Sequence, residues 1–336
     1  MTTFQSASSR RLELPPSGGR ESTLPLLEAM DSKEFVFSAQ LMLERSIIKL
    51  LSNFRNDISV SLVDSNLCLS GPVALNCRLN TILWKSREFS AMHVGPYPDE
   101  TGLSVGAAQF LYYNLVKKIQ CWSIHKFDIQ SVFLGKTYNA TEIYSALRKF
   151  SSKISFRKES NWPNAAALDI YNNHIVGLYR DRSEAGPRAL GNRTIIANPT
   201  IVGNVVKMNK IKKRVGSPYA SIILQEELSL WLKGGPDVSP FLNFSYKVRE
   251  DKRSAVPAIV HTDGTARVQT INSENNDLYA LVTCFKDMVG VPIVMKTSLN
   301  ESGKAMIDSP LSAIEFLLNT SLDVLYINNY RLEKKY

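Results

Sequence analysis

The pattern of apolar and polar residues first becomes regular at Glu34. Before that point, residues 1–33 are rich in Ser, Arg, Pro and Gly, which predicts a flexible tail without a packed core. From there onward, apolar residues recur at helical spacing, at Val36, Leu43, Ile47, Leu50 and Phe54. This spacing predicts an amphipathic helix that buries one face.

Farther along, the pattern predicts a strand, a glycine turn and a helix in succession. Asn66–Ser70 is a short apolar run of strand length, Gly71 follows it, and Val73–Trp84 has helical spacing. Small residues at 106–108 predict a helix that packs closely on a sheet, whereas the mixed composition of 120–131 predicts a linker.

The second half of the chain alternates apolar runs of strand length with helical patterns. The expected strands are Ile175–Tyr179, Ala266–Ile271, Val291–Met295 and Val324–Ile327. The expected helices are Thr141–Arg148, capped by Asn139 or a neighbouring threonine, Val202–Lys213, and one that Ser309 and Pro310 open. This alternation indicates a mixed α/β (α+β) fold, with domains at residues 34–130 and 131–336.

Composition narrows the class of protein. At 336 residues, 44% hydrophobic and 21% charged, the chain is long enough for two domains with cores and is not of the disordered or fibrous class. No apolar run reaches the length of a membrane span, and residues 1–31 lack the pattern of a signal peptide. The four cysteines fit no metal-ligand spacing, so we expect reduced, buried thiols in a cytoplasmic protein without a membrane partner.

The chain has a net charge of +9, and its basic residues are densest at Lys207–Arg214. Three interpretations of this patch are open: a nucleic-acid surface, a solvated helix face, or a basic wall for phosphorylated substrates. Because no aromatic residues for base stacking are interleaved with these lysines, we favour the last two over nucleic-acid binding.

The strongest candidate for chemistry is the arginine-rich stretch Arg180–Thr194, which follows an expected strand. Arg188 and Arg193 carry planar donor forks that match phosphate or carboxylate oxygens, and Asn192 can bind a sugar or a base edge. Gly186 lets the backbone approach a ligand closely. The alternative is a surface turn whose charges are only solvated.

Two later stretches add polar groups that an anion pocket needs. An Asp-Gly turn leads into an expected strand on which Arg267 and Gln269 project from the same face. Thr297, Ser298 and Asn300 supply hydroxyl and amide groups at the end of another expected strand, which is a usual ligand position. Arg267 is alternatively a surface arginine.

The glycine turn after the first expected strand is a second candidate for anion binding. A strand, a turn at Gly71 and a helix start direct backbone N–H groups and the helix dipole toward an anion. Asn76 and Asn80, four residues apart, would share one face of the expected helix. There they either hold a nucleotide or only solvate that face.

Written as a pattern, the arginine-rich stretch is R-x-E-x-G-P-R-A-L-G-N-R-T, and it resembles the signature of the O-carbamoyltransferases that act on nodulation factors and antibiotics. Four more stretches agree in the family's order: Asn66–Cys77, Thr101–Ala108, His261–Thr270 and Val291–Asn300. The resemblance runs from about Phe35 to about Glu333. It implies the second lobe of an actin-like (Kae1-like) domain, followed by a YrdC-like C-terminal domain.

The resemblance implies an enzyme that uses carbamoyl phosphate and ATP with Mg²⁺. Its YrdC-like domain forms carbamoyl adenylate, and an Fe(II)-type metal site in the actin-like domain presents this intermediate to a sugar hydroxyl of the acceptor. The implied catalytic residues are Arg188, Arg193, Arg267, Ser298 and Asn300. The implied ligands of the nucleotide and of carbamoyl phosphate are Arg182, Glu184, Gly186, Asn192, His261, Asp263, Thr297, Gly71 and Asn76, and the implied metal ligand is Glu100, or Asp99 beside it.

The chain also departs from the family's pattern. Pro72 replaces a glycine whose N–H would bind phosphate, Ser217 replaces an arginine, and Lys296 replaces an asparagine. The first lobe of the actin-like domain would lie ahead of Phe35, so we expect a separate polypeptide to supply it. Two other functions are open, namely a non-catalytic nucleotide-binding subunit and, with less support, an RNA-binding protein of the YrdC type.

Overall fold

The computed structural model describes residues 32–58, 65–116, 132–214 and 219–335. The chain divides into two compact units, Met1–Val60 and Ser61–Tyr336. Three parts of the sequence prediction lie outside the described residues, namely the tail up to residue 31, the linker at 120–131 with the domain boundary at its end, and Ser217.

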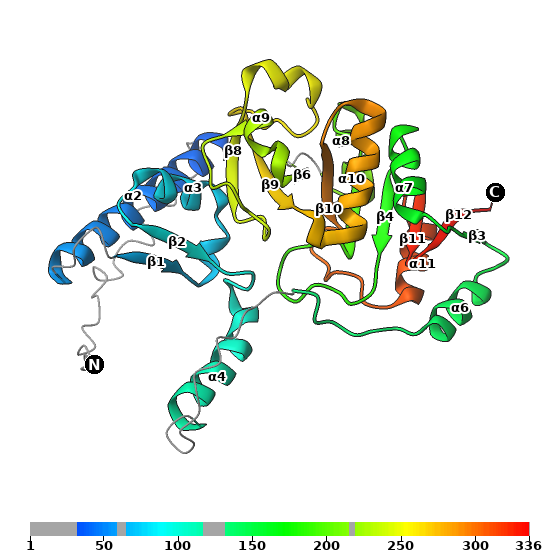
Figure 1. The fold of residues 1–336 in the computed structure, drawn as a ribbon, viewed down its shortest axis with the longest axis horizontal. Coiled ribbons are helices and arrows are strands. Elements are labelled where there is room, and N and C mark those ends of the chain that lie inside the picture. Colours follow the sequence, from blue (N-terminus) through cyan, green and yellow to red (C-terminus); the bar gives the residue numbers. More distant parts are fainter. Residues whose placement is uncertain (1–31, 59–64, 117–131, 215–218, 336) are drawn as a thin grey trace. The chain divides into compact units, whose positions relative to one another are not determined.

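The first unit contains helix α2, Ser32–Ile58, which confirms the helix expected from the apolar spacing (Figure 1). The expected burial of one face is wrong, because Val36, Leu50 and Phe54 are 65%, 47% and 60% exposed. An amphipathic helix buries its apolar stripe only against a partner, and the described part of this unit holds no second element that could cover it.

The second unit begins with a small sheet and two helices. These elements are β1 (Asn66–Leu69), α3 (Cys77–Ser86), β2 (Ala91–Val94) and α4 (Leu103–Leu111). The two strands pair in parallel. Polar side chains attach α3 to the large sheet of this unit, where Asn80 Nδ2 donates to Asn243 O at 2.9 Å. Thr81 Oγ1 makes a similar bond to Ser245 O at 2.9 Å.

The structure corrects the helix expected at Val73–Trp84. The chain instead forms a 3-10 helix, Pro72–Leu75, before α3, and Asn76 lies between the two in extended backbone. The Oδ1 atom of Asn76 accepts a hydrogen bond from Leu79 N at 3.1 Å, so this side chain caps α3. Asn76 and Asn80 therefore do not share a helix face, and Asn80 is fully buried.

The close packing expected for the small residues 106–108 is also wrong. No residue of α4 is buried, and Leu103 and Phe110 are both 70% exposed. A Cβ added at Gly106 would meet no atom within 4 Å. The small side chains of this helix therefore do not pack on a sheet in the described structure.

A ten-stranded mixed sheet forms the centre of the second unit (Figure 1). Its strands, in sheet order, are β3 (Ile154–Lys158), β12 (Tyr330–Lys334), β11 (Val324–Ile327), β4 (Val176–Tyr179), β5 (Arg193–Ala197), β10 (Ile293–Ser298), β6 (Ala220–Leu224), β9 (Thr265–Ile271), β8 (Phe244–Val248) and β7 (Leu232–Lys233). The pairs β4–β11 and β6–β9 are parallel, and the other pairs are antiparallel. This sheet confirms the mixed α/β class and contains each strand expected in the second half of the chain.

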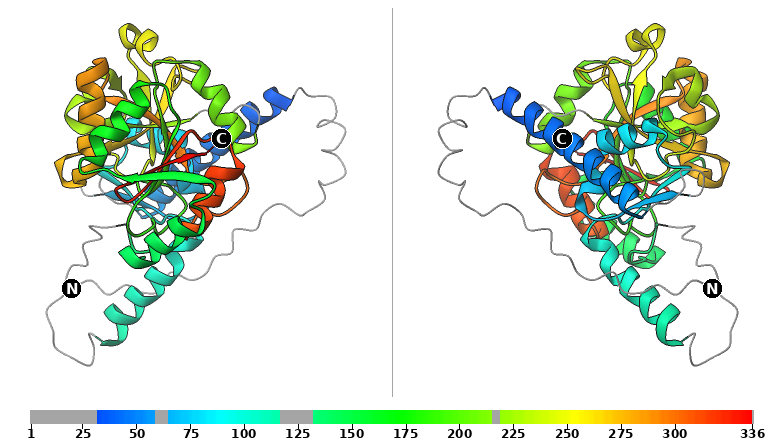
Figure 2. Two further views of the ribbon diagram at one scale, coloured as in Figure 1. Left: turned by 90° about the vertical axis from the view of Figure 1, so that its right-hand side faces the viewer. Right: turned by 90° about the vertical axis from the view of Figure 1, so that its left-hand side faces the viewer.

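Helices cover both faces of this sheet. They are α6 (Ala140–Lys149), α7 (Trp162–Tyr171), α8 (Gly203–Lys212), α9 (Leu228–Trp231), α10 (Asn276–Val289) and α11 (Pro310–Asn319). Helices α7 and α10 lie on one face, and α8 and α11 lie on the other (Figures 1 and 2). Asn139 caps α6 through a capping box with Glu142, as expected. Within the described ranges, no helix is long and apolar enough to cross a membrane.

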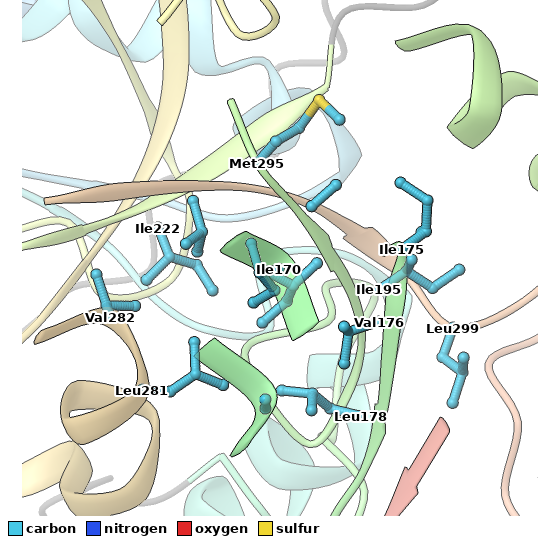
Figure 3. Packing of buried hydrophobic residues seen from close by; sticks show 14 of the residues in the cluster. Ile170, Ile175, Val176, Leu178, Ile195, Ile222, Leu281, Val282, Met295 and Leu299 are labelled. Carbon is cyan, nitrogen blue, oxygen red and sulfur yellow. The ribbon is translucent and has the colours of Figure 1, made fainter. Parts of the chain in front are cut away.

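The buried core lies between the sheet and its helices. Ile170 of α7 and Leu281 and Val282 of α10 gather beside the strand residues Leu178 and Ile222 (Figure 3). All five side chains are 0% exposed. Burial of such a side chain stabilises the fold by roughly 2 kcal/mol, so the strands and helices of this unit are held together by a well-packed core.

Candidate functional site

Four cationic side chains meet at a cavity of about 270 Å³ in the second unit. They are Arg188, Arg214, Arg267 and Lys296. The sequence predicted four residues of this wall, namely Arg188, Arg267, Thr297 and Ser298. None of the described residues that line the cavity is acidic. Such a concentration of positive charge favours a ligand that carries negative charge.

The sheet register explains why residues far apart in the sequence meet here. Arg267 on β9 pairs with Ala220 on β6, and Ala220 in turn pairs with Lys296 on β10. Directly paired residues on neighbouring strands project from the same side of a sheet, so the two cations flank a small alanine. The methyl group of this alanine leaves room for the cavity between them.

Arg188 reaches the cavity from residues 180–192, which join β4 to β5 and are named the arginine loop below. Its Nη2 atom donates to Leu75 O at 3.2 Å. Its Nε atom is buried and has no hydrogen-bond partner in the described structure. A guanidinium carries five N–H donors, so most of this fork is available to a ligand.

Arg193 does not line the cavity, which corrects its expected catalytic role. Its side chain is 0% exposed, and its guanidinium carbon lies 3.6 Å from the centroid of the Tyr179 ring. The guanidinium donates to four backbone carbonyls, those of Arg180, Asp181, Asn192 and Ile307. These bonds tie the two ends of the arginine loop together and leave little donor capacity for a ligand.

Glu184 and Asn192, two expected ligands, are likewise used inside the arginine loop. Oε1 of Glu184 accepts hydrogen bonds from the backbone N–H groups of Leu190, Asn192 and Arg193, at 2.7, 2.8 and 3.2 Å. Asn192 Nδ2 donates to a carbonyl of the same loop at 2.8 Å. Three charge-assisted bonds to a buried carboxylate fix the turn that presents Arg188 to the cavity.

Gly186 and Arg182 also lie away from the cavity wall. Gly186 has a φ of +97°, and a Cβ there would lie 3.0 Å from Tyr97 Cδ1 and 3.1 Å from Pro96 O. This glycine therefore permits close approach to another segment of the protein, not to a ligand as expected. Arg182 is exposed and donates to Gly135 O at 3.2 Å.

The Asp-Gly turn before β9 lies beside the cavity without lining it. His261 Nε2 contacts Tyr219 O at 3.3 Å, and burial lowers the pKa of this histidine, which keeps it neutral at pH 7. Asp263 accepts hydrogen bonds from Thr265 N and Oγ1, at 2.9 and 2.6 Å. Its carboxylate also forms an ion pair with Arg78 at 3.7 Å. Both expected ligands therefore shape the turn.

The end of β10 is held by a lysine that the sequence did not single out. Lys212 of α8 is 2% exposed, and its Nζ donates to Ser298 O at 2.9 Å and Asn300 O at 2.6 Å. The same amine contacts the Ser298 hydroxyl at 3.2 Å. Burial lowers the pKa of Lys212 to about 8, with a contribution from Arg214. Ser298 lines the cavity, whereas Asn300, outside the described wall, supports it from behind.

This arrangement separates the basic patch Lys207–Arg214 into different roles. Lys207 is exposed, and Lys212 is buried under the end of β10. Arg214 lines the cavity, with its guanidinium carbon 4.7 Å from the centroid of the Tyr219 ring. Of the three interpretations of the patch, a basic wall for an anionic ligand fits Arg214 best.

The first glycine turn and the acidic pair are not part of the described cavity wall. Gly71, with a φ of +97°, donates its N–H to Pro98 O, so this donor is not directed at a ligand. Asp99 Oδ1 accepts hydrogen bonds from Thr101 N and Oγ1, and Glu100 is exposed. No three His, Cys, Asp or Glu side chains of the described ranges gather to hold a metal ion. The expected metal ligand Glu100, or Asp99 beside it, therefore stays a prediction.

Lys296 is the most deeply buried cation of the cavity. Its side chain is 1% exposed, and its Nζ donates to Ala189 O at 2.7 Å and to Gln269 Oε1. Both acceptors are uncharged. Burial lowers the pKa of Lys296 to about 7; Glu184 opposes this shift, and two arginines of the cavity add to it.

Replacement of Lys296 with methionine (Lys296→Met) is expected to stabilise the fold at pH 7. In the unfolded chain the lysine binds a proton below a pH of about 10, whereas in the folded chain it does so only below a pH of about 7. The free energy of unfolding therefore falls as the pH is lowered from about 10 to about 7, and methionine removes this loss. After subtraction of the two lost hydrogen bonds, we expect a gain of roughly 2 kcal/mol.

Thermal unfolding of both proteins at about pH 7 and about pH 10 checks this expectation. At the higher pH the folded lysine is neutral and most of the linkage cost is gone, so after the two lost hydrogen bonds the advantage of Lys296→Met should shrink to near zero or reverse. An equal gain at both pH values would show that the charge of Lys296 is not its cause.

Comparison with known proteins gives two matching family models. The model of the carbamoyltransferase C-terminus matches residues 167–334, and that of the carbamoyltransferase N-terminus matches residues 20–109. The chain belongs to the carbamoyltransferase family. Every described residue of the cavity wall falls within the match to the C-terminal family model.

Individual relatives agree with this assignment. The chain is 32% identical to nodulation protein NolNO of Sinorhizobium fredii, over 90% of this chain and 44% of that protein. It is also 32% identical to nodulation protein NolO of Bradyrhizobium diazoefficiens, over 89% of this chain and 54% of that protein. The chain therefore spans about half the length of these curated relatives. Among solved structures, full-length HypF is similar over 54% of this chain and 22% of that chain, with 20% identity and a TM-score of 0.36.

Proposed function

We propose that the cationic cavity binds the carbamoyl donor and the nucleotide of a carbamoyltransferase. The observation that carries this proposal is the meeting of Arg188, Arg267 and Lys296 in a wall whose described residues include no acid. Family membership supports a carbamoyl group as the group that is transferred. The hydroxyl groups of Thr297 and Ser298 lie beside these cations, where they can donate to or accept from an amide.

The proposed donor substrates are carbamoyl phosphate and ATP, the latter bound with Mg²⁺. Water first displaces phosphate from carbamoyl phosphate, which gives carbamate and inorganic phosphate. A carbamate oxygen then bonds to the α-phosphorus of ATP, forming carbamoyl adenylate and releasing pyrophosphate. In the transfer step, an acceptor hydroxyl bonds to the carbamoyl carbon, its proton passes to solvent, and AMP leaves. The product is an O-carbamoylated sugar.

The cavity residues suit these steps by charge and geometry. Arg188 and Arg267 would bind phosphate oxygens, since a guanidinium fork holds two of them at once and neutralises the charge that grows on a leaving phosphate. Ser298, which Lys212 fixes through its carbonyl and hydroxyl, would orient the carbamoyl amide. The task of such a site is mainly to gather anionic groups without mutual repulsion.

The resemblance adds an Fe(II)-type metal and a sugar acceptor such as a nodulation factor or an antibiotic. No group of three metal-ligand side chains gathers in the described residues, and no step above is routed through a metal. Because the chain spans about half of its relatives, we propose that the remaining half, on the same or a separate polypeptide, binds the acceptor. The proposal includes the cytoplasm as its compartment, where free thiols stay reduced. Of the described cysteines only Cys77 is buried as expected, whereas Cys68 is exposed and Cys284 is partly exposed.

The proposal predicts exchange of labelled pyrophosphate into ATP that depends on carbamoyl phosphate. Arg267→Met should lower the exchange rate about 100-fold, because removal of one pre-positioned donor for a developing charge has an effect of this size. Arg182→Ala removes an exposed arginine outside the described cavity wall and serves as the matched control. It should keep more than about half of the rate.

Two results would count against the proposal. ATP binding without any exchange would favour the alternative of a non-catalytic nucleotide-binding subunit. Equal losses in Arg182→Ala and Arg267→Met would show that the reaction does not take place at this cavity.

A further inference from the structure

Lys296 differs from the other cations of the cavity because its side chain is buried and has only uncharged partners. A protonated lysine carries three N–H donors, and two of them serve Ala189 O and Gln269 Oε1. Because Lys296 also lines the cavity, the third donor is available to a ligand there. No carboxylate of the described residues forms an ion pair with this amine.

The charged groups around Lys296 are unbalanced in the empty cavity. The arginine loop contributes Arg188 and Glu184, and β9 contributes Arg267. The residues that pair with Lys296 on β5 and β6 are apolar. Two positive charges thus face the amine against one carboxylate, and Oε1 of this carboxylate already accepts three backbone N–H bonds. Lys212 approaches the site only through the end of β10.

We propose that Lys296 takes up a proton when an anion enters the cavity, and that the site thereby selects doubly charged groups such as phosphate or sulfate over singly charged ones. This inference rests on the proposed function for the location of the donor site and deepens it. An anion between Arg267 and Lys296 supplies the negative charge that the empty cavity lacks. An opposite charge at this range favours the ammonium form of a buried lysine.

Proton uptake makes the affinity depend on pH in one direction. Below pH 7 most of the amine is already protonated in the empty cavity, so the association constant should be nearly flat. Above this value each bound anion brings a proton with it, and the association constant falls by up to about tenfold per pH unit. For a pKa of about 7, the expected fall between pH 6.5 and pH 8.5 is roughly 20-fold.

Other titratable groups near the cavity need separate treatment. Burial lowers the pKa of His261 and raises the pKa of Cys77 and Tyr219, so these three keep their charge state above pH 6.5 and up to pH 8.5. Lys212, with a pKa of about 8, changes charge within this range. A variant of Lys212 is therefore the matched control for a variant of Lys296.

Calorimetric titration of the full chain with sulfate tests the proposal, since sulfate keeps its double charge throughout this pH range. Titrations at pH 6.5, 7.5 and 8.5, each in two buffers of different protonation enthalpy, give the affinity and the number of protons taken up. Wild type should take up about one proton per sulfate at pH 8.5 and bind roughly 20-fold more weakly there than at pH 6.5. Lys296→Met should change less than about twofold across the range, whereas Lys212→Met should keep the dependence. At pH 6.5, nitrate should bind about tenfold more weakly than sulfate.

The inference is overturned by no proton uptake by wild type, by a pH dependence that persists in Lys296→Met, or by equal affinities for nitrate and sulfate. If the pH dependence of sulfate affinity disappeared in Lys212→Met and not in Lys296→Met, Lys212 would be the group that takes up the proton. This result would overturn the inference as well. Failure of the proposed function is distinguishable, because sulfate binding with proton uptake but without pyrophosphate exchange leaves this inference standing. Pyrophosphate exchange without proton uptake would support the proposed function and overturn this inference.

Discussion

Arg193→Met should lower the free energy of unfolding by about 4 kcal/mol and the Tm by roughly 10 °C. The Arg193 guanidinium is fully buried, stacks on Tyr179 and donates to four backbone carbonyls. A hydrogen bond from a charged donor contributes about 1.5–3 kcal/mol, and methionine replaces none of the four. The loss stays below their sum because carbonyls of a loop can partly bind water instead. Chemical and thermal denaturation measure the effect.

Two further variants, one in the arginine loop and one at Arg193 itself, make this prediction specific. Arg182→Ala removes an exposed arginine and should change stability by less than about 0.5 kcal/mol. Arg193→Lys keeps the charge, but one ammonium group cannot reach four carbonyls, so about half of the loss should remain. If Arg193→Met kept its Tm while ligand binding disappeared, the catalytic role expected from the sequence would be restored.

The sequence allowed the strands of the large sheet to be predicted because the central ones are buried. Strands β4 and β11 are buried along their whole length, so they carry uninterrupted apolar runs that a sequence pattern detects directly. The meeting of Arg267 with Ser298 followed from motif order and from the position of polar residues at strand ends. Edge strands such as β3, with only one buried residue, gave no such signal.

The sequence could not distinguish Arg188 from Arg193, although the structure gives them different tasks. Both arginines lie in one short motif, with the same side chain and the same charge. Arg193 is the first residue of β5 and turns inward against Tyr179, whereas Arg188 lies within the loop that Glu184 fixes. Side-chain direction depends on the register and on the path of a loop, which residue types alone do not specify.

Burial of charge was equally hidden in the sequence. Lys212 and Lys296 are 2% and 1% exposed, yet lysine is mostly a surface residue, so the sequence pattern does not reveal that both amines are buried. The converse error concerns α2 and α4, whose apolar residues are exposed where the sequence predicted packing. A periodic pattern identifies which face of a helix would be buried, but the partner is a property of the tertiary structure.

The largest effect on ligand binding is expected at Arg188. Its Nη2 atom bonds to Leu75 O and its Nε atom is buried, which leaves N–H donors of the two terminal nitrogens for a ligand in the cavity. Arg188→Lys keeps the charge but loses the bidentate geometry, so the binding of carbamoyl phosphate should weaken by about 1–3 kcal/mol. Arg188→Ala loses both and should weaken binding further, by about 100-fold or more in total. Calorimetric titration of wild type and both variants with carbamoyl phosphate, and then with ATP, measures the change.

The stability of the same variants decides how the loss is interpreted. Because the Arg188 side chain makes one hydrogen bond within the described structure, to Leu75 O at 3.2 Å, Arg188→Ala should keep the Tm within about 2 °C of wild type, the opposite of Arg193→Met. Equal affinities for wild type and both Arg188 variants would mean that the fork does not bind the donor. A large fall in the Tm of Arg188→Ala would mean instead that the bond from Arg188 to Leu75 O holds the 3-10 helix Pro72–Leu75 against the arginine loop. Arg188 would then support the shape of the cavity and not bind the ligand itself.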